Sequence, residues 1–321
     1  MDEFELIARH FTRPGRSAKA ALALGVGDDC ALLQPAPGQQ LAVSTDMLVE
    51  GRHFLSTVAP ERLGHKALAV NLSDLAACGA EPLGCTLALA LPRADESFVA
   101  PFARGLFALA DAHGIELVGG DTTAGPLNIC ITVFGQVPAG QALLRSGAKA
   151  GDELWVSGST LGDARLALEV FRGTQALPGA DFEAVRRAME QPQPRVTLGI
   201  ALRGLASSAI DISDGLLGDL GHVLQRSGVG ATLLADALPR SAVLAAMPMA
   251  LQHQCLLAGG DDYELLFTAP AARHAAVLAA AAQAGVAVHH CGHIEAAQGL
   301  RVVDRNRDAV ATPWRSFDHF A

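Results

Sequence analysis

Six short motifs place an aspartate beside glycine, serine, threonine or a second aspartate, most of them next to an apolar run. They are Gly27-Asp28-Asp29, Ser44-Thr45-Asp46, Leu72-Ser73-Asp74, Gly120-Asp121-Thr122, Asp211-Ile212-Ser213-Asp214 and Gly260-Asp261-Asp262. Basic residues near them are few, and none lies between Lys19 and Arg52. A carboxylate in an apolar setting is costly unless it is paired, hydrogen-bonded or bound to a cation. Because short carboxylates beside hydroxyls suit hard cations, the motifs predict a Mg²⁺ site.

Each motif taken alone also has a purely structural explanation. Aspartate beside glycine is common in turns, and Asp121 or Asp214 could simply cap a helix. The cation site is favoured because six such motifs occur in one chain with few bases to match them.

The composition indicates a globular protein of two domains. The chain has 321 residues, of which 50% are hydrophobic and 18% are charged, so it can bury a large core. Its formal net charge is -9 and its basic residues form no cluster, which argues against nucleic-acid binding. An anionic ligand would be repelled by this charge unless a cation accompanied it.

The cellular location predicted from the sequence is the cytoplasm, with no association with a membrane. The six cysteines are scattered and form no C-x-x-C pair, as is typical of reduced thiols. The acidic start MDEFELIARHF differs from a signal peptide. The longest uncharged apolar stretch, residues 275–288, is shorter than the roughly 18 residues that a membrane-spanning helix needs.

Apolar strands alternate with helices along the chain, which predicts an α/β or α+β fold. In the first part we expect strands at 40–44, 85–91 and 128–134 and helices at 61–78 and 96–113. In the second part we expect a helix after Gly162, an alanine-rich helix from Ala271, and a final pair of strands around His290 and Val302. The predicted domains are 1–140 and 141–321, since a turn and a loop separate the two parts.

Common nucleotide-binding and catalytic motifs are missing from the sequence. There is no P-loop, kinase H-R-D or hydrolase G-x-S-x-G motif, and the glycines at 25–30 do not fit G-x-G-x-x-G. The sequence therefore excludes the standard nucleotide folds.

A series of longer motifs carries a resemblance. They are GVGDDCALL, STDMLVEGRHF, HKALAVNLSDLAACGAEP, VGGDTT, RSGAKAGDELWVSG, AIDISDGLLGDLGH and GGDDYEL. In this order they resemble the thiamine-monophosphate kinase family of the aminoimidazole ribonucleotide synthetase-like superfamily, and the resemblance extends to the C-terminal WRSFDHF. It implies a homodimer whose N-terminal domains form a β-barrel interface, with ATP and several Mg²⁺ ions in a cleft between the two domains. It also implies the reaction, in which ATP phosphorylates thiamine monophosphate to thiamine diphosphate.

The resemblance also implies roles for individual residues, carried over motif by motif. The implied metal ligands are Asp29, Ser44, Thr45, Asp46, Asp74, Asp121, Asp211 and Asp214. The implied ATP contacts are Gly120, Asp121, Arg145 and Ser213, of which Asp121 and Arg145 are also the predicted catalytic residues. The implied substrate contacts are His53, Asp261 and Phe317. The family commonly has Gly-Gly-Glu-Asp where this chain has Gly-Gly-Asp-Asp, so Asp261 replaces a longer acid.

The residues themselves support these roles unequally. A guanidinium such as Arg145 suits a phosphate in an acidic setting, and the ring of Phe317 suits a cationic aromatic ligand. His53, by contrast, has no ligand spacing, and without the resemblance the sequence favours an ordinary, partly buried histidine. Because phosphoryl transfer depends on positioning and on charge neutralisation, we expect direct in-line transfer assisted by Mg²⁺.

Three other functions remain open from the sequence. A Mg²⁺-dependent phosphohydrolase would use the same aspartates to activate water, and would need no acceptor. A metal-binding carrier protein would be stabilised by the metal and would catalyse no reaction. Another ATP-using synthetase of the superfamily would act on a formyl or carboxyl group.

Overall fold

The computed structural model describes residues 3–13, 22–26 and 29–317. It divides into two compact units, and the chain passes from one to the other after Gly140. The first unit contains residues up to Leu75 together with Ala80–Gly140, and the second contains Ala76–Gly79 and the chain from Gln141 onward.

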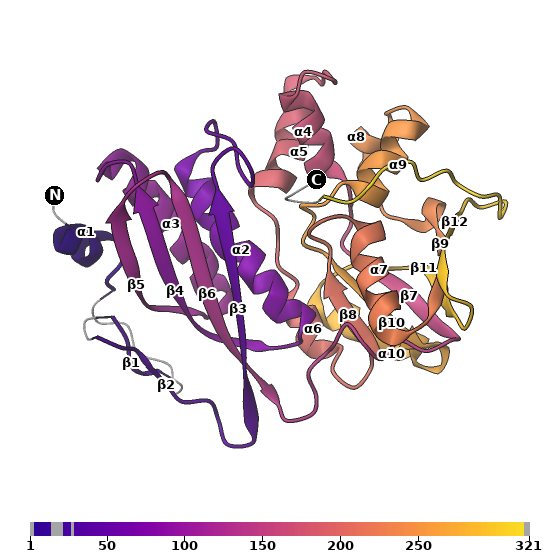
Figure 1. Ribbon diagram of the computed structural model, residues 1–321, viewed down its shortest axis with the longest axis horizontal. Coiled ribbons are helices and arrows are strands. Elements are labelled where there is room, and N and C mark those ends of the chain that lie inside the picture. Colours follow the sequence, from indigo (N-terminus) through magenta and orange to yellow (C-terminus); the bar gives the residue numbers. More distant parts are fainter. Residues whose placement is uncertain (1–2, 14–21, 27–28, 318–321) are drawn as a thin grey trace. The chain divides into compact units, whose positions relative to one another are not determined.

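The first unit is built on a four-stranded sheet with the strand order β3-β6-β4-β5 (Figure 1). Its strands are β3 (Gln39–Val49), β4 (Glu81–Leu91), β5 (Glu116–Ala124) and β6 (Asn128–Pro138), and a separate short hairpin is formed by β1 (Leu22–Leu24) and β2 (Leu32–Leu33). Its helices are α1 (Glu3–His10), α2 (Pro60–Ala77) and α3 (Glu96–His113). β6 runs antiparallel to both β3 and β4, whereas β4 and β5 are parallel.

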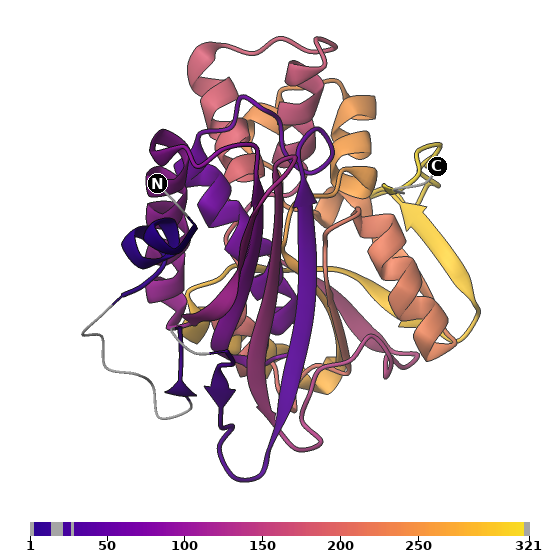
Figure 2. The ribbon, with the colours of Figure 1, turned by 60° about the vertical axis from the view of Figure 1, so that its left-hand side comes forward.

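Helices α2 and α3 lie against the same face of this sheet (Figures 1 and 2). Along β6 every second residue is buried, as expected when one face of a strand meets the core. The two helices approach each other closely, since a Cβ on Gly64 would lie 2.0 Å from the carbonyl oxygen of Phe102. A Cβ on Gly105 would lie 1.8 Å from the carbonyl oxygen of Glu61. Only glycine therefore allows this helix crossing.

The other face of the sheet is largely open and partly apolar. On β3, Leu41, Val43 and Met47 are 48%, 55% and 53% exposed. Alternate residues of a strand point to opposite faces, and these three share the face that is turned away from α2 and α3.

The second unit is built on a six-stranded mixed sheet with the order β12-β9-β11-β7-β10-β8. Its strands are β7 (Asp152–Ser157), β8 (Ser208–Asp211), β9 (Gly230–Leu234), β10 (Leu265–Pro270), β11 (Val288–Glu295) and β12 (Gly299–Val303). Its α-helices are α4 (Asp163–Phe171), α5 (Gly179–Glu190), α6 (Val196–Ala201), α7 (Leu216–Ser227), α8 (Ala242–Ala245), α9 (Met249–Ala258) and α10 (His274–Ala284). Apolar residues of α4, α5, α7 and α9 form one buried core with residues of the strands.

The structure confirms the mixed α/β architecture and most of the predicted elements. The strands expected at 40–44, 85–91 and 128–134 lie within β3, β4 and β6, and the two long helices are α2 and α3. The strands predicted around His290 and Val302 are β11 and β12. Their pairing with each other was predicted wrongly, because β9 lies between them and pairs with both. Within the described part of the chain, no helix is both long enough and apolar enough to cross a membrane.

Candidate active site

In the first unit, three of the predicted metal residues lie where β3 meets α2. The hydroxyl of Ser44 on β3 donates a hydrogen bond to the carboxylate of Asp74 on α2. One helical turn earlier, the side-chain oxygen of Asn71 accepts a hydrogen bond from the backbone N–H of Asp46 at 3.0 Å. Ser44 and Asp46 are two residues apart on a strand and therefore share a face. A hydroxyl and two carboxylates are thus grouped as a hard cation requires.

Thr45 does not join this group through its side chain. Its hydroxyl lies 2.8 Å from that of Thr132 on β6, on the opposite face of the sheet from Ser44. Of the groups of Thr45, the backbone carbonyl oxygen therefore remains as the candidate metal ligand.

Asp121 lies apart from Asp46 within one copy of the chain. It belongs to β5, which β4 and β6 separate from β3, a distance of about 14 Å at the usual strand spacing. Its register partner is Ala88, an exposed residue on the open face of the sheet. Asp46 and Asp121 are both inside strands, so the expectation of aspartates in turns and strand ends was wrong for them. A helix-capping role for Asp121 is likewise ruled out.

Gly120 is required by the backbone itself. Its φ is +150°, and a Cβ would lie 1.9 Å from the carbonyl oxygen of Leu87 on the neighbouring strand. The residue predicted to contact ATP therefore also has a structural reason to be glycine.

The remaining predicted residues of the first unit lie outside the Ser44–Asp74 group. Asp29 is exposed in a bend before β2, and Gly27 and Asp28 fall outside the described residues. His53 follows β3, and its Nδ1 accepts a hydrogen bond from the N–H of Val49 at 3.0 Å. The segment around it borders a pocket of about 380 Å³, which is lined by Val49, Glu50, Gly51, Leu55, Ser56, Pro126 and Leu127.

In the second unit, the predicted residues meet at the segment between β8 and α7. The N–H of Asp261 donates to the carbonyl oxygen of Ser213 at 2.7 Å. The N–H of Phe317 donates to the carbonyl oxygen of Asp214 at 2.9 Å. Asp211 ends β8 immediately before this segment. Residues predicted for metal and ATP are therefore in direct backbone contact with residues predicted for the substrate.

The substrate-side loop has an unusual backbone. Asp261 has a φ of +64° and Tyr263 a φ of +53°, a left-handed conformation that costs of order 1–3 kcal/mol per residue and is frequent at functional sites. The loop is held in this form by the hydrogen bond of Asp261 and by a second one, from the N–H of Tyr263 to the carbonyl oxygen of Ile212, at 2.8 Å.

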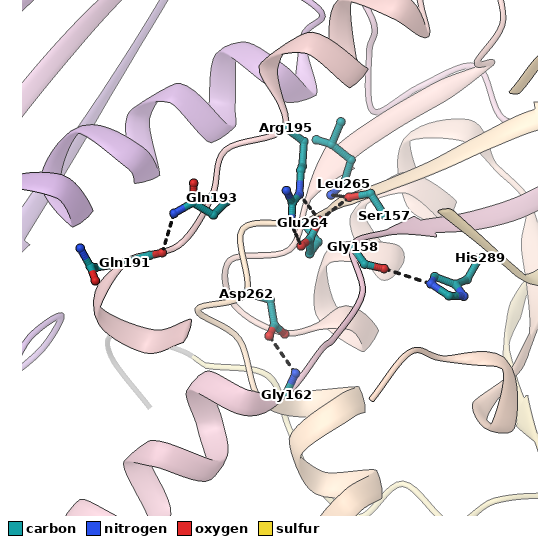
Figure 3. Close-up of polar contacts among 10 residues, drawn as sticks. All are labelled: Ser157, Gly158, Gly162, Gln191, Gln193, Arg195, Asp262, Glu264, Leu265 and His289. Atoms are coloured by element: carbon teal, nitrogen blue, oxygen red, sulfur yellow. Dashed lines mark hydrogen bonds and ion pairs between the residues drawn. The ribbon is translucent and has the colours of Figure 1, made fainter. Parts of the chain in front are cut away.

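Two further carboxylates of this loop, those of Asp262 and Glu264, bind other parts of the second unit (Figure 3). Asp262 accepts a hydrogen bond from the N–H of Gly162 at 2.8 Å. Burial raises the pKa of Asp262 well above its ordinary value, and the charges of neighbouring acids add to this effect. Buried Glu264 forms an ion pair with Arg195 and accepts a hydrogen bond from the hydroxyl of Ser157. These contacts connect the loop to the starts of α4 and α6 and to the end of β7.

Asp219, which the sequence analysis did not single out, binds the backbone of the Ser213 segment. Asp219, only 3% exposed, accepts hydrogen bonds from the N–H groups of Ser213, Asp214 and Gly215 at 3.2, 3.3 and 3.1 Å. Burial and the charge of Asp214 raise its pKa to about 7, although the three hydrogen bonds act in the opposite direction. The only sequence signal was its place in the first turn after the Asp-Gly motif.

Arg145 is not near Ser213. The hydroxyl of Ser227, at the C-terminal end of α7, donates to the carbonyl oxygen of Arg145 at 3.4 Å. Ser213 precedes the other end of this 12-residue helix, which is about 18 Å long. Arg145 lines a pocket of about 430 Å³ with His222, Gln225 and Arg226. This position does not allow Arg145 and Ser213 to contact the same phosphate group within one copy of the second unit.

Comparison with known proteins identifies the family. Residues 27–137 match the model of the AIR synthase related protein N-terminal domain, and residues 149–305 match that of the C-terminal domain. The chain is 46% identical to the thiamine-monophosphate kinase of Salmonella typhimurium over 99% of its own length and 98% of that protein. The chain belongs to the thiamine-monophosphate kinase family.

Solved structures of the family have the same fold. The thiamine-monophosphate kinase of Stenotrophomonas maltophilia is 46% identical, with a TM-score of 0.84 and 96% of each chain covered. The protein AaThiL, solved in complex with AMPPCP and TMP, is 30% identical, with a TM-score of 0.77 and 89% of each chain covered. A thiamine-monophosphate kinase is a phosphotransferase, so membership of the family argues against the hydrolase and the carrier.

The donor groups are chemically suited to Mg²⁺. Among the described residues, no three His, Cys, Asp or Glu side chains gather at one point to hold a metal by themselves. Mg²⁺ usually takes one or two protein carboxylates and completes its shell with water and phosphate oxygens. The sparse groups around Asp74 and around Asp214 match this preference.

Proposed function

We propose that this protein transfers the γ-phosphoryl group of ATP to the phosphate of thiamine monophosphate, and so produces thiamine diphosphate. The observation that carries the proposal is the backbone contact of Ser213 and Asp214 with Asp261 and Phe317, because nucleotide and acceptor residues must lie close together for a direct transfer. The similarity to thiamine-monophosphate kinases over nearly the whole chain supports it.

Several Mg²⁺ ions are proposed as cofactors. Ser44, Asp46 and Asp74 would hold them in the first unit, and Asp211 and Asp214 in the second, with Asp29, Asp121 and the carbonyl oxygen of Thr45 as further donors. When bound, such ions neutralise the charge of the phosphates. This matters here because the protein itself has a net charge of -9.

The substrate groups of the second unit are suited to thiamine monophosphate. The side chain of Phe317 is 46% exposed, and an aromatic ring suits a cationic aromatic ligand. The carboxylate of Asp261 would attract the positive charge of the thiazolium. His53, which follows β3, is proposed as a third contact.

The residues of the chain act by binding and orientation in this proposal. The nucleophile is a phosphate oxygen whose second pKa is near ~6, so it is mostly deprotonated at neutral pH and needs no general base. Arg145 is proposed to bind the nucleotide away from the transferred group, because α7 separates it from Ser213. Gly120 and Asp121 are proposed to contact the nucleotide and its metal.

A second copy of the chain is the proposed partner, in a cytoplasmic homodimer. Leu41, Val43 and Met47 form an exposed apolar stripe on the open sheet face, and the strand order leaves the long strand β3 at an edge. An exposed apolar edge strand favours association with another sheet. Two such sheets facing each other would close into the β-barrel expected for the family. The six free cysteines are in keeping with a reducing compartment.

The proposed reaction is tested by incubating the protein with Mg²⁺, ATP and a panel of phosphorylated acceptors, while ADP and products are followed by chromatography. We expect ADP and thiamine diphosphate in equal amounts, only when thiamine monophosphate is present, and no turnover in excess chelator. Phosphate release without an acceptor would mean a hydrolase. Turnover with a formyl or carboxyl acceptor would mean a synthetase of the same superfamily.

A further inference from the structure

The backbone N–H and carbonyl groups of residues 213–215 are all hydrogen-bonded. This segment connects the residues proposed for metal and nucleotide with those proposed for the substrate. The carbonyl oxygens of Ser213 and Asp214 face the substrate side. Ser213 accepts from the N–H of Asp261, and Asp214 accepts from the N–H of Phe317. The carbonyl oxygen of Gly215 accepts from the N–H of Asp219 at 3.1 Å, in the first turn of α7, and from the hydroxyl of Ser316 at 3.4 Å. The position of the three peptides therefore decides where the substrate residues lie.

The N–H groups of the same three residues face inward, toward one carboxylate. All three donate to a single oxygen of Asp219, Oδ2, at 3.1 to 3.3 Å. The side chain is buried, so water cannot readily take over these hydrogen bonds, and an unsatisfied buried N–H costs roughly 1–3 kcal/mol. Gly215 has a φ of +123°, and its N–H is bound to Asp219 in this left-handed conformation.

We propose that Asp219 is a positioning residue that holds the Ser213–Gly215 segment, and thereby sets both the metal and nucleotide residues and the substrate residues Asp261 and Phe317. This inference rests on the proposed function of those residues. Asp219 does not contact a ligand itself. It acts through the backbone: its carboxylate binds the N–H groups of the segment, and the carbonyl oxygens of Ser213 and Asp214 bind Asp261 and Phe317.

An ordinary helix cap would have a narrower effect. A carboxylate near the start of α7 stabilises the helix whatever its neighbours do. In that case substitution would lower the stability of the fold and leave the affinities of the folded enzyme unchanged. Positioning makes a different prediction, since metal binding and thiamine monophosphate binding would weaken together in folded protein.

The test uses the full-length Asp219→Ala and Asp219→Asn variants. Asn keeps an acceptor of the same size, so it should retain part of the function that Ala loses. We expect the KM for thiamine monophosphate and the Mg²⁺ concentration for half-maximal rate to rise together, by about 10- to 100-fold, as is typical when a residue that orients ligand-bearing groups is lost. Calorimetry with thiamine monophosphate and a non-hydrolysable ATP analogue should show the same loss of affinity without turnover.

Asp152→Asn is the matched control. Asp152 is a buried aspartate of the same unit that accepts a backbone hydrogen bond, from the N–H of Lys149 at 2.9 Å. It pairs with Pro270, whereas Asp211 pairs with Leu265, so about 17 Å of β10 separates it from the Ser213 segment. This variant should be less stable, but its KM for thiamine monophosphate and its Mg²⁺ concentration for half-maximal rate should stay within twofold of the wild type.

Amide hydrogen exchange supplies a measurement that does not depend on turnover. In the wild-type protein without ligands, the N–H groups of residues 213–215 should exchange slowly, and in folded Asp219→Asn they should exchange faster while the rest of α7 stays protected. The proposal is overturned if these amides exchange freely in the wild type. It is also overturned if a folded Asp219 variant keeps both constants within the range of the Asp152→Asn control. A wild-type protein that fails to phosphorylate thiamine monophosphate would refute the proposed function, whereas the exchange result would stand by itself.

Discussion

Ser44 on β3 donates its hydroxyl hydrogen bond to the carboxylate of Asp74 on α2, 30 residues further along the chain. The contact gives Asp74 a fixed orientation next to Asp46, whose backbone is held by Asn71 from the same helix. A strand and a helix thus present oxygen donors from two directions before any cation binds, which is the type of preorganisation that a metal site needs.

Asp46→Asn and Asp74→Asn should therefore lower kcat by about 100-fold or more. Charge stabilisation by a bound metal is worth several kcal/mol, and about 1.4 kcal/mol corresponds to a factor of ten in rate. The melting temperature of the metal-free protein should change little or rise, because each variant removes one of two neighbouring negative charges. Steady-state kinetics and thermal unfolding provide the measurements.

Asp111→Asn is the control for these variants. Asp111 is a partly exposed carboxylate of the same unit that pairs with Arg13, and such pairs contribute little. Its variant should keep normal kinetics. If Asp46→Asn and Asp74→Asn unfold early but turn over normally per folded molecule, their carboxylates are structural and not metal ligands.

Gly120→Ala should destabilise the first unit as well as reduce activity. A Cβ at this position meets the carbonyl oxygen of Leu87 at 1.9 Å, and relieving such a clash typically costs about 1–3 kcal/mol. Gly119→Ala is the neighbouring control, because its Cβ would only touch a methyl group of Thr86 at 3.9 Å. Urea unfolding should separate the two variants, and equal stabilities would show that β5 can move away from β4.

Asp163 should make the unfolding free energy depend on pH. Burial raises the pKa of its carboxyl above 3.8, and hydrogen bonds from Ser241 and Thr160 offset only part of this. Above pH 3.8 the unfolded chain releases the proton first, so the folded state loses relative stability as the pH rises toward the folded pKa. In Asp163→Asn this dependence is absent. The unfolding free energy of the wild type, relative to that of Asp163→Asn, should thus be largest at low pH and should decrease as the pH rises.

Ser241→Ala supplies the matched comparison. The Ser241 hydroxyl donates to Asp163 at 2.6 Å and so helps to keep the carboxylate ionised. Without it the pKa of Asp163 should rise further, and the loss of stability should extend to higher pH. A difference curve that is flat between pH 4 and pH 7, or that slopes the other way, would contradict the raised pKa.

The local parts of the fold were predictable from the sequence, and the reasons lie in short-range chemistry. α3 begins after Asp95, whose carboxylate accepts from the N–H of Ser97, and ends at Gly114 in a left-handed conformation. These signals lie within the helix ends themselves. In the same way, the alternation along β6 reflects one buried face.

What depends on distant parts of the chain was not predictable. That β9 separates β11 from β12 is decided by strand pairing across the whole second unit. The faces of Ser44 and Thr45 became clear only with α2 in place. The roles of Asp219 and the distance of Arg145 from Ser213 likewise depend on how α7 packs, which its own residues do not reveal.

Val43→Glu should convert the proposed dimer to monomers. Val43 is 55% exposed on the open face of the first sheet, and burying an unpaired carboxylate between two such faces is costly. Leu278→Glu on α10, where the leucine is 44% exposed, should leave the dimer intact. Sedimentation at micromolar concentration measures both. A wild-type protein that is monomeric there, or a Val43→Glu variant that stays dimeric, would rule out this face as the interface.

Transfer should be direct, with inversion at the transferred phosphorus. The acceptor is already an anion at neutral pH, so charge repulsion is the obstacle and proton removal is not. Asp261 and Phe317 are fixed to the backbone of Ser213 and Asp214, an arrangement that suits holding donor and acceptor in line. An aspartyl phosphate would require two displacements, each with inversion, and would give net retention. ATP whose γ-phosphorus is made chiral with sulfur and oxygen isotopes should thus yield inverted product. Retention would disprove direct transfer, but it would be consistent with the proposed kinase function.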